Sequence, residues 1–128
     1  MIVNGGKVIL QQQQLAYLAT CYWKLFTSNT TISATTTWSD LTEAAFTGYT
    51  PFLAGAWTTA ALVGGKGKST PSTLPTFLNS SGAGQTVYGW ALVDPAGTSL
   101  VAAYNFGAAT IPDLGLLGLN PSITDDQE

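Results

Sequence analysis

Two β-rich segments joined by a strong turn sequence limit this chain to a narrow range of folds. Residues 85–93 and 99–106 consist mainly of small, aromatic and other apolar side chains, a composition that favours strands. Between them lies Asp94-Pro95-Ala96-Gly97, with proline and glycine at the second and fourth positions, as a β-turn prefers. The pattern predicts an antiparallel hairpin. Because residues 85–93 are apolar on both faces, we expect that strand to be central and covered on both sides.

Further short strands are expected on either side of this hairpin. In residues 20–26, one set of side chains alternates with another: the first is Cys21, Trp23 and Leu25, and the second is Tyr22, Lys24 and Phe26. This period of two is typical of a strand. The other expected strands are Ala56–Val63, Thr76–Asn79 and Leu114–Asn120. Six or seven short strands separated by turns predict a mainly β fold, a single β-sandwich or jelly-roll-like domain over residues 1–128.

The two ends of the chain and two loops complete the expected organisation. Apolar side chains at helical spacing predict a short helix over Val8–Ala19, within an N-terminal arm of residues 1–19. Ser28–Thr37 and Gly64–Pro75 are expected to be loops, the second one exposed and mobile. Residues 110–128 are expected to form a C-terminal arm. Its acidic end consists of Asp125, Asp126 and Glu128.

The chain carries unusually few charges. It has four lysines, seven acidic residues, no arginine and no histidine, so charged residues make up 9% of the sequence, against about 25% in an average domain. A net charge of −3 makes nucleic acid a poor partner. The apolar stretches are too short to span a membrane, and the N-terminal residues lead us to expect no secretory signal. We therefore expect a protein made in the cytoplasm, with an uncharged surface suited to close packing against other proteins.

Side chains that perform catalysis or bind metals are scarce. Without histidine, neither a Ser-His-Asp nor a Cys-His arrangement is possible. With the single cysteine, Cys21, an ordinary zinc site is excluded as well; Cys21 is expected to be a small buried side chain. Asp40 and Glu43 are a close carboxylate pair, and they have the spacing of a capping box in one helical turn over residues 39–43. We expect no catalytic residue, metal or cofactor.

Aromatic residues and lysines supply the candidate contacts. Trp23 and Trp90 lie in strand patterns and are expected in the core. Asn29-Thr30-Thr31 and Asn79-Ser80-Ser81 match the N-glycosylation pattern, which we attribute to chance because no secretory signal accompanies it. Two tryptophans outside clear strand patterns and two lysines in the glycine-rich loop remain as candidates for exposed contacts. They are Trp38, Trp57, Lys66 and Lys68.

Three segments carry a resemblance to a known group of proteins. They are Lys24–Ser28 (KLFTS), Asp40–Tyr49 (DLTEAAFTGY) and Gln85–Trp90 (QTVYGW). By these segments, over residues 15–106, the chain resembles small structural proteins of tailed-phage particles. Tyr104-Asn105-Phe106 matches a further element loosely, without the charges of the group. The resemblance implies membership of the virion and no catalytic residue.

These observations lead to one leading hypothesis for function and two alternatives. The leading hypothesis is a non-enzymatic capsid decoration (cement) protein that binds the outside of a phage head as a homo-oligomer, expected to be a trimer. Its partners would be the major capsid protein and copies of itself, without nucleic acid or membrane. The first alternative is a tail or baseplate component, including a module that binds host glycans through Trp38 and Trp57. A remote alternative is a glycosidase that uses Asp40 and Glu43.

Overall fold

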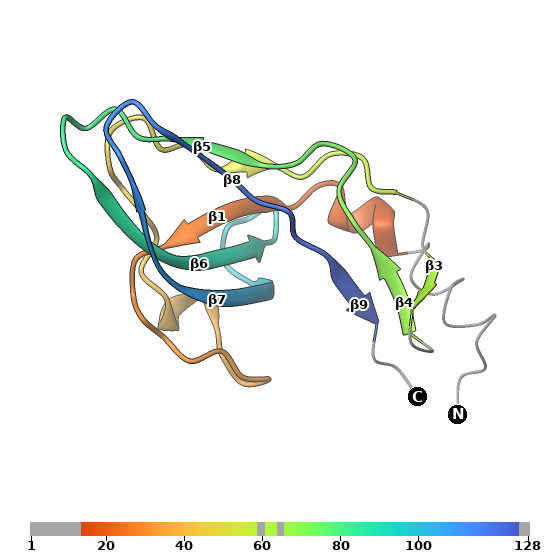
Figure 1. The fold of residues 1–128 in the computed structure, drawn as a ribbon. Coiled ribbons are helices and arrows are strands. Elements are labelled where there is room, and N and C mark those ends of the chain that lie inside the picture. The colour runs from red at the N-terminus through yellow and green to blue at the C-terminus, as the bar shows by residue number, and fades with distance from the viewer. Residues whose placement is uncertain (1–13, 59–60, 64–65, 126–128) are drawn as a thin grey trace.

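The fold is mainly β and antiparallel, as the sequence predicts. The computed structural model describes residues 14–58, 61–63 and 66–125 (Figure 1). Within them, residues 14–18 are helical and Trp38–Asp40 form a short 3-10 helix. The strands are β1 Tyr22–Phe26, β2 Phe52–Leu53, β3 Ala61–Val63, β4 Lys66–Ser69, β5 Thr76–Leu78, β6 Gln85–Val93, β7 Leu100–Ile111, β8 Leu116–Gly118 and β9 Ile123–Asp125.

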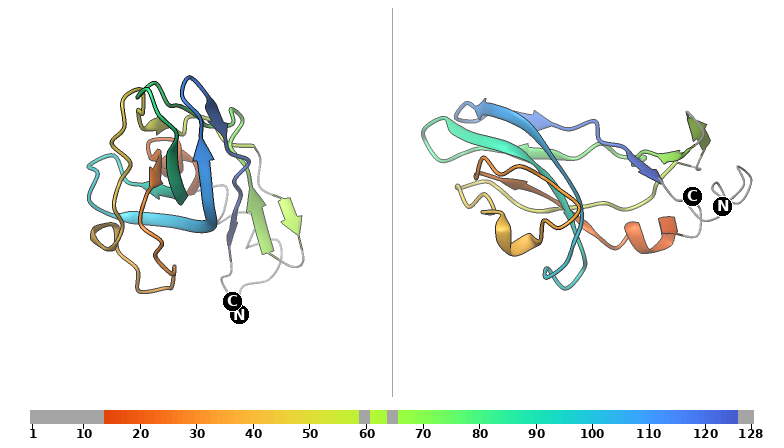
Figure 2. Two further views of the ribbon diagram at one scale, coloured as in Figure 1. Left: turned by 60° about the vertical axis from the view of Figure 1, so that its left-hand side comes forward. Right: turned by 90° about the horizontal axis from the view of Figure 1, so that it is seen from below.

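Three antiparallel sheets make up the body of the domain. The largest has the order β2-β1-β6-β7, the second β3-β4-β9 and the third β5-β8. Figure 2 shows the four-stranded sheet at one end, with the long path from β7 through β8 to β9 returning across the molecule. In this arrangement the expected C-terminal arm is part of the folded body as far as residue 125, because β8 pairs with β5 and β9 pairs with β4.

The predicted hairpin is confirmed as β6 and β7. The two strands pair from Gln85↔Ile111 to Val93↔Leu100, and β6 lies between β1 and β7 as expected. In the turn, the N–H of Gly97 donates to the carbonyl oxygen of Asp94 at 3.0 Å. The carboxylate of Asp94 accepts the backbone N–H groups of Ser99 and Thr98, at 2.9 and 2.8 Å. These hydrogen bonds lower the pKa of Asp94, and the bond from the N–H of Ser99 has the largest effect.

Side chains pack on both faces of the four-stranded sheet. On one face, Trp23 lies 5.6 Å from Trp57 and 5.1 Å from Trp90 between ring centroids. This main core also contains Leu25, Phe77, Val87 and Leu92. On the other face, Phe26, Leu41, Ala91 and Val93 form a second cluster, covered by Ile32 and Trp38. Trp23 and Trp90 are buried, so the prediction that they belong to the core is confirmed.

Three of the expected elements differ from the structure. Of the helix expected over Val8–Ala19, residues 14–18 are helical and 8–13 lie outside the described residues. The strand expected over Ala56–Val63 is described only as Ala61–Val63, preceded by an isolated bridge between Trp57 and Pro71. The loop expected over Gly64–Pro75 is wrong for Lys66–Ser69, which forms β4 between β3 and β9. Its glycine and lysines have low strand propensity, so partners distant in sequence determine this strand.

The capping box is also displaced from its expected position. The helical turn spans Trp38–Asp40 after Thr37, so Asp40 ends the turn and does not begin it. Its carboxylate accepts the backbone N–H and the hydroxyl of Thr37, at 2.9 and 3.1 Å. Glu43 lies beyond the turn and forms an isolated antiparallel bridge with Phe26. The expected pairing of Asp40 with Glu43 is therefore wrong.

Candidate functional site

The acidic side chains on which catalysis would depend are used by the fold. Asp40 and Asp94 accept the turn hydrogen bonds described above. Asp113 Oδ1 accepts the N–H of Gly82 at 2.9 Å. Glu43 Oε1 lies 3.4 Å from Nζ of Lys24, in an ion pair whose side chains are 32% and 14% exposed. Each of these carboxylates therefore has a local partner that accounts for its position.

Glu43 also belongs to a hydrogen-bonded group with Tyr49. The hydroxyl of Tyr49 donates to Glu43 Oε2 at 2.9 Å and accepts the backbone N–H of Leu25 at 3.3 Å. Burial, together with the hydrogen bond and the negative charge of Glu43, raises the pKa of Tyr49 above its usual range. The phenol therefore stays protonated, and it fastens residues 43–49 to β1.

Replacing Tyr49 by phenylalanine is expected to lower the free energy of unfolding by about 1–2 kcal/mol, because Glu43 and the N–H of Leu25 each lose a partner. Thermal unfolding should show a Tm lower by roughly 5 °C. Tyr88→Phe is the matched control, since Tyr88 is also half-buried and its hydroxyl makes no hydrogen bond among the described residues. Equal Tm values for the two variants would contradict the role given to the Tyr49 hydroxyl.

The four contact residues expected from the sequence do not form one exposed site. Trp38 is half-buried in the second cluster, with Nζ of Lys24 5.3 Å from its ring centroid. Trp57 is half-buried against the main core, and its Nε1 is buried without a hydrogen-bond partner among the described residues. The two tryptophans thus lie on opposite faces of the sheet. Lys68 is half-buried in β4, and for Lys66 only the backbone, also in β4, is described.

Three exposed leucines form a feature that we call the leucine knob: Leu78, Leu114 and Leu116. Leu78 of β5 and Leu116 of β8 are direct cross-strand partners, so they share a face of this sheet. The neighbouring pair, Phe77 and Leu117, packs on the main core. A solvated antiparallel sheet normally has polar residues on its outer face, but here Leu78 and Leu116 are 39% and 68% exposed.

Leu114 is the most exposed member of the knob and has a strained backbone. It is 75% exposed, and its φ of +61° makes it the one non-glycine residue with positive φ among those described. This conformation costs an L-residue about 1–2 kcal/mol. The backbone holds it in place, because the N–H groups of Leu114 and Gly115 donate to the carbonyl oxygens of Asn79 and Pro112. A strained, exposed leucine is a feature found at functional sites.

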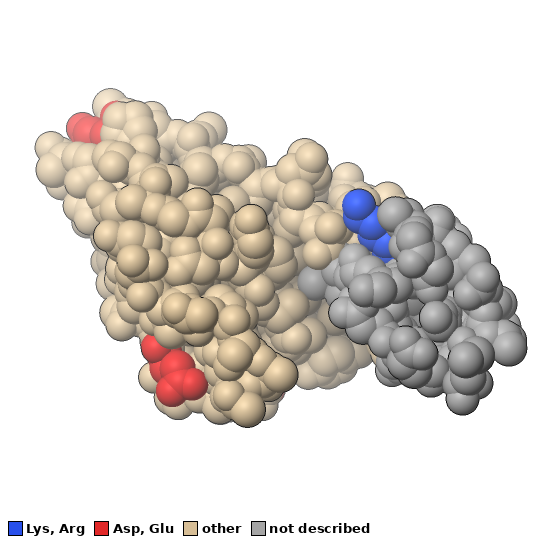
Figure 3. All heavy atoms as spheres, turned by 60° about the horizontal axis from the view of Figure 1, so that its bottom comes forward, with Lys and Arg blue, Asp and Glu red and all other residues tan. Residues whose placement is uncertain are grey.

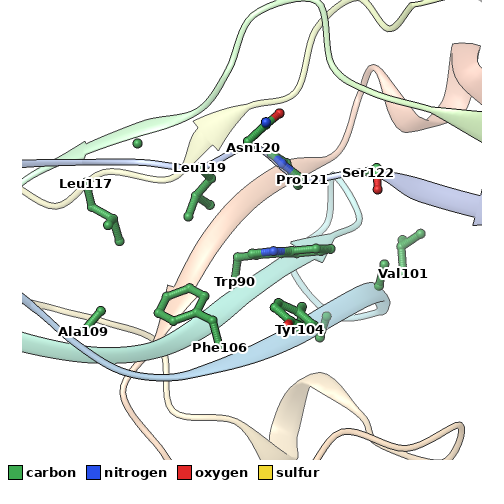
Figure 4. Close-up of a pocket in the computed structure, with 13 residues that line it drawn as sticks. Trp90, Val101, Tyr104, Phe106, Ala109, Leu117, Leu119, Asn120, Pro121 and Ser122 are labelled. Carbon is green, nitrogen blue, oxygen red and sulfur yellow. The ribbon is translucent and has the colours of Figure 1, made fainter.

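A groove of about 730 Å³, lined by apolar side chains and by polar groups, lies between β7 and residues 117–122. We call it the slot and define it by Trp90, Tyr104, Phe106, Leu117, Leu119 and Pro121. Figure 4 shows Leu117 and Leu119 on one wall, pointing toward Phe106 and Trp90 on the other. The residues that line the slot are all uncharged, and Asn120 and Ser122 supply polar groups. Tyr104 is 57% exposed, so an aromatic surface is open to a partner.

Charge is sparse on one face of the described part of the molecule. Figure 3 shows a face with small acidic and basic areas and otherwise uncharged residues over the described part. The low charge content of the sequence predicts this weakly charged surface. The sequence does not reveal the knob or the slot, because exposed leucines and core leucines look alike in a sequence. The turn residues around Leu114, namely Pro112, Asp113 and Gly115, were the one signal that it lies at a chain reversal.

The described part of the chain shows two further properties. Its helical segments fall short of the length and apolar character that a bilayer crossing demands. Its acidic and cysteine side chains do not gather in groups of three or more that would suit a metal ion. Comparisons with protein-family models, with curated proteins and with solved structures give no match.

Proposed function

We propose that this chain is a non-enzymatic structural protein of a tailed-phage particle, acting as a decoration protein on the outside of the head. The observation that carries the proposal is that one small, weakly charged domain has both an exposed leucine knob and an open slot. Exposed apolar features of this kind mark protein–protein contacts. The resemblance of the KLFTS, DLTEAAFTGY and QTVYGW segments supports a place in the virion.

The mechanism would be mechanical. Knob and slot bury apolar area against neighbouring subunits, and each Å² of apolar surface removed from water contributes about 25 cal/mol. Few ions must be desolvated, since the described carboxylates already have partners within the fold. A modest affinity at each contact is multiplied when a subunit binds several neighbours of a regular shell at once. The protein would in this way reinforce the shell without any chemical step.

The test of this function is imaging of purified phage particles with an antibody against the chain. We expect label spread regularly over the head, because a decoration protein follows the symmetry of the shell. Preimmune serum on the same particles is the control. Label confined to the tail would replace the decoration role with that of a tail or baseplate component. Particles without label, together with chain found only in the particle-free fraction, would contradict the proposal.

A further inference from the structure

We propose that the slot binds a neutral oligosaccharide, with Tyr104 as its aromatic platform. The inference goes beyond the proposed structural role, because a contact with a shell requires no ligand. Three properties of the site carry it: an exposed aromatic ring, polar side chains that make no hydrogen bond to the described part of the chain, and a lining without charge. A hollow with aromatic walls and a few polar groups is the usual form of a site for a small organic ligand.

Tyr104 supplies a surface on which a sugar ring can stack. Its side chain is 57% exposed and lies on β7, at an edge of the four-stranded sheet. The centroid of its ring is 6.3 Å from that of the buried Trp90, which supports it from the core. The face of a pyranose ring that carries C–H groups packs on an aromatic ring, while the hydroxyl groups remain at the rim. A tyrosine, with an apolar ring and a polar tip, suits this mixed surface.

Trp90 adds a hydrogen-bond donor inside the slot. Its side chain is 9% exposed and lines the slot (Figure 4), and its Nε1 makes no hydrogen bond to the described residues. A buried indole N–H normally has an acceptor. The indole nitrogens of Trp23 and Trp57 are enclosed by the protein. That of Trp90 is not, so a hydroxyl oxygen of a sugar in the slot can accept its hydrogen.

Asn120 and Ser122 place further polar groups in the slot. Asn120 is exposed and Ser122 is half-buried, and neither side chain forms a hydrogen bond within the part of the chain that the structure describes. An amide offers two donors and an acceptor, and a hydroxyl both donates and accepts. Neighbouring hydroxyl groups of a sugar need donors and acceptors side by side. Polar groups placed in this way fix the orientation of a ligand that the aromatic rings hold.

A second hollow extends the site beyond Tyr104. It has a volume of about 450 Å³ and is lined by Thr31, Ile32, Ala103, Tyr104 and Asn105. Because Tyr104 lines both hollows, a chain of several sugars fits the site better than a single sugar. The residues that line the two hollows are all uncharged. An acidic sugar would therefore lose water from its carboxylate without gaining a cation, and the expected ligand is neutral.

The leucine knob stays free when a sugar occupies the slot, because none of its three leucines lines the slot. One subunit can therefore contact a shell through the knob and hold a sugar on the same domain. A shell contact that also covers the slot would compete with the sugar. The purified chain, in which the slot is open, is therefore the sample for the test.

The test is isothermal titration calorimetry of the purified full chain with four neutral hexasaccharides: maltohexaose, cellohexaose, mannohexaose and chitohexaose. We expect at least one of them to bind with a dissociation constant of about 1 mM or lower. The hexamer of galacturonic acid has a similar length and a carboxylate on each sugar. It should bind at least about tenfold more weakly than the best neutral hexasaccharide, because the lining offers no cation.

Variants of the chain locate the binding. Tyr104→Ala should weaken the affinity for the hexasaccharide that binds by at least about tenfold, because the platform is lost. Asn120→Ala should weaken it by about threefold or more, because a hydrogen-bonding side chain is removed. Tyr17→Ala is the matched control, since Tyr17 is 51% exposed and lies outside the slot, and its affinity should be unchanged. Thermal unfolding checks that each variant folds.

Three results would overturn the inference: no binding of any of the four hexasaccharides, an affinity that survives Tyr104→Ala, or equally tight binding of the charged hexamer. The proposed function can fail separately. Phage heads that carry the label, together with a chain that binds no sugar, would remove this site and leave the structural role standing. A chain that binds sugar through Tyr104 but is absent from particles would do the reverse.

Discussion

Replacing Gly89 by alanine is expected to lower the free energy of unfolding by about 3 kcal/mol, because the site has no room for a methyl group. Gly89 lies in β6, where a Cβ atom would overlap both the carbonyl oxygen of Tyr104 on β7 and the ring of Phe26 on β1. Neither neighbour can move easily. The first is backbone in the β6–β7 ladder, and the second is a fully buried ring in the second cluster. The cost is a large part of the stability of a domain of this size.

Thermal unfolding of Gly89→Ala should therefore show a Tm lower by roughly 10 °C. Gly118→Ala is the control, since a Cβ there meets no atom within 4 Å, and its Tm should stay within about 2 °C of the unmodified chain. A second comparison isolates the ring. Phe26→Leu combined with Gly89→Ala should cost less than the two single changes added together, because removal of the ring relieves part of the overlap. Additive effects, or a Gly89→Ala protein as stable as the control, would contradict the packing described.

Gly89 also brings together three segments that lie far apart in the sequence, KLFTS, DLTEAAFTGY and QTVYGW. Phe26 belongs to the KLFTS segment and Gly89 to the QTVYGW segment, and the ring of one lies over the other. The third segment, DLTEAAFTGY, joins them through the bridge between Phe26 and Glu43 and through the Tyr49 hydroxyl, which accepts the N–H of Leu25. All three segments therefore meet at the end of β1. Packing and hydrogen bonding within the fold therefore link the three segments.

The sequence predicted the parts of the fold that local pattern controls. The hairpin of β6 and β7 followed from strand composition on both sides of Asp94-Pro95-Ala96-Gly97, and the burial of Trp23 and Trp90 followed from their strand positions. β4 was missed because Lys66–Ser69 has no strand pattern of its own and depends on β3 and β9. Trp57 was expected to be exposed, but packing against Trp23 covers most of it. Its cover comes from a strand more than thirty residues away in sequence, which no local pattern shows.

The candidate site could not be predicted from the sequence, because it too depends on contacts between distant residues. Leu116 and Leu117 are adjacent and chemically identical, but one is 68% exposed and the other packs on the main core. Which of them faces outward depends on the register of β8 against β5. The slot exists because residues 117–122 lie apart from β7 after the turn that follows Ile111. Neither the register of β8 nor the separation of residues 117–122 from β7 can be predicted from the sequence.

Replacing Asn79 by aspartate is expected to destabilise the protein by about 4 kcal/mol at neutral pH, because a buried donor becomes a buried acceptor. Asn79 is fully buried. Its Nδ2 donates to the carbonyl oxygens of Ala83 and Ile111, both at 2.8 Å, and its Oδ1 accepts the N–H and the hydroxyl of Ser81. This side chain joins the turn after β5 to the end of β7. The side-chain amide of Asn79, which the glycosylation pattern Asn79-Ser80-Ser81 would use as the acceptor, is therefore in the interior.

Aspartate has the same shape as asparagine, so the effect of the change is electrostatic, and pH separates it from any packing defect. Burial beside two carbonyl oxygens disfavours the charged form and raises the folded-state pKa of the new carboxyl above its unfolded value of about 3.9. A group with a raised pKa is tolerated best when it is protonated. The loss in Tm relative to the unmodified chain should therefore be largest at pH 7, roughly 15 °C, and should shrink as the pH falls toward about 4.

Asn120→Asp, at an exposed position, is the control and should show little loss at either pH. A loss for Asn79→Asp that is the same at both pH values would show that charge is not its cause. No loss at all would show that the Asn79 hydrogen bonds do not hold the turn to β7.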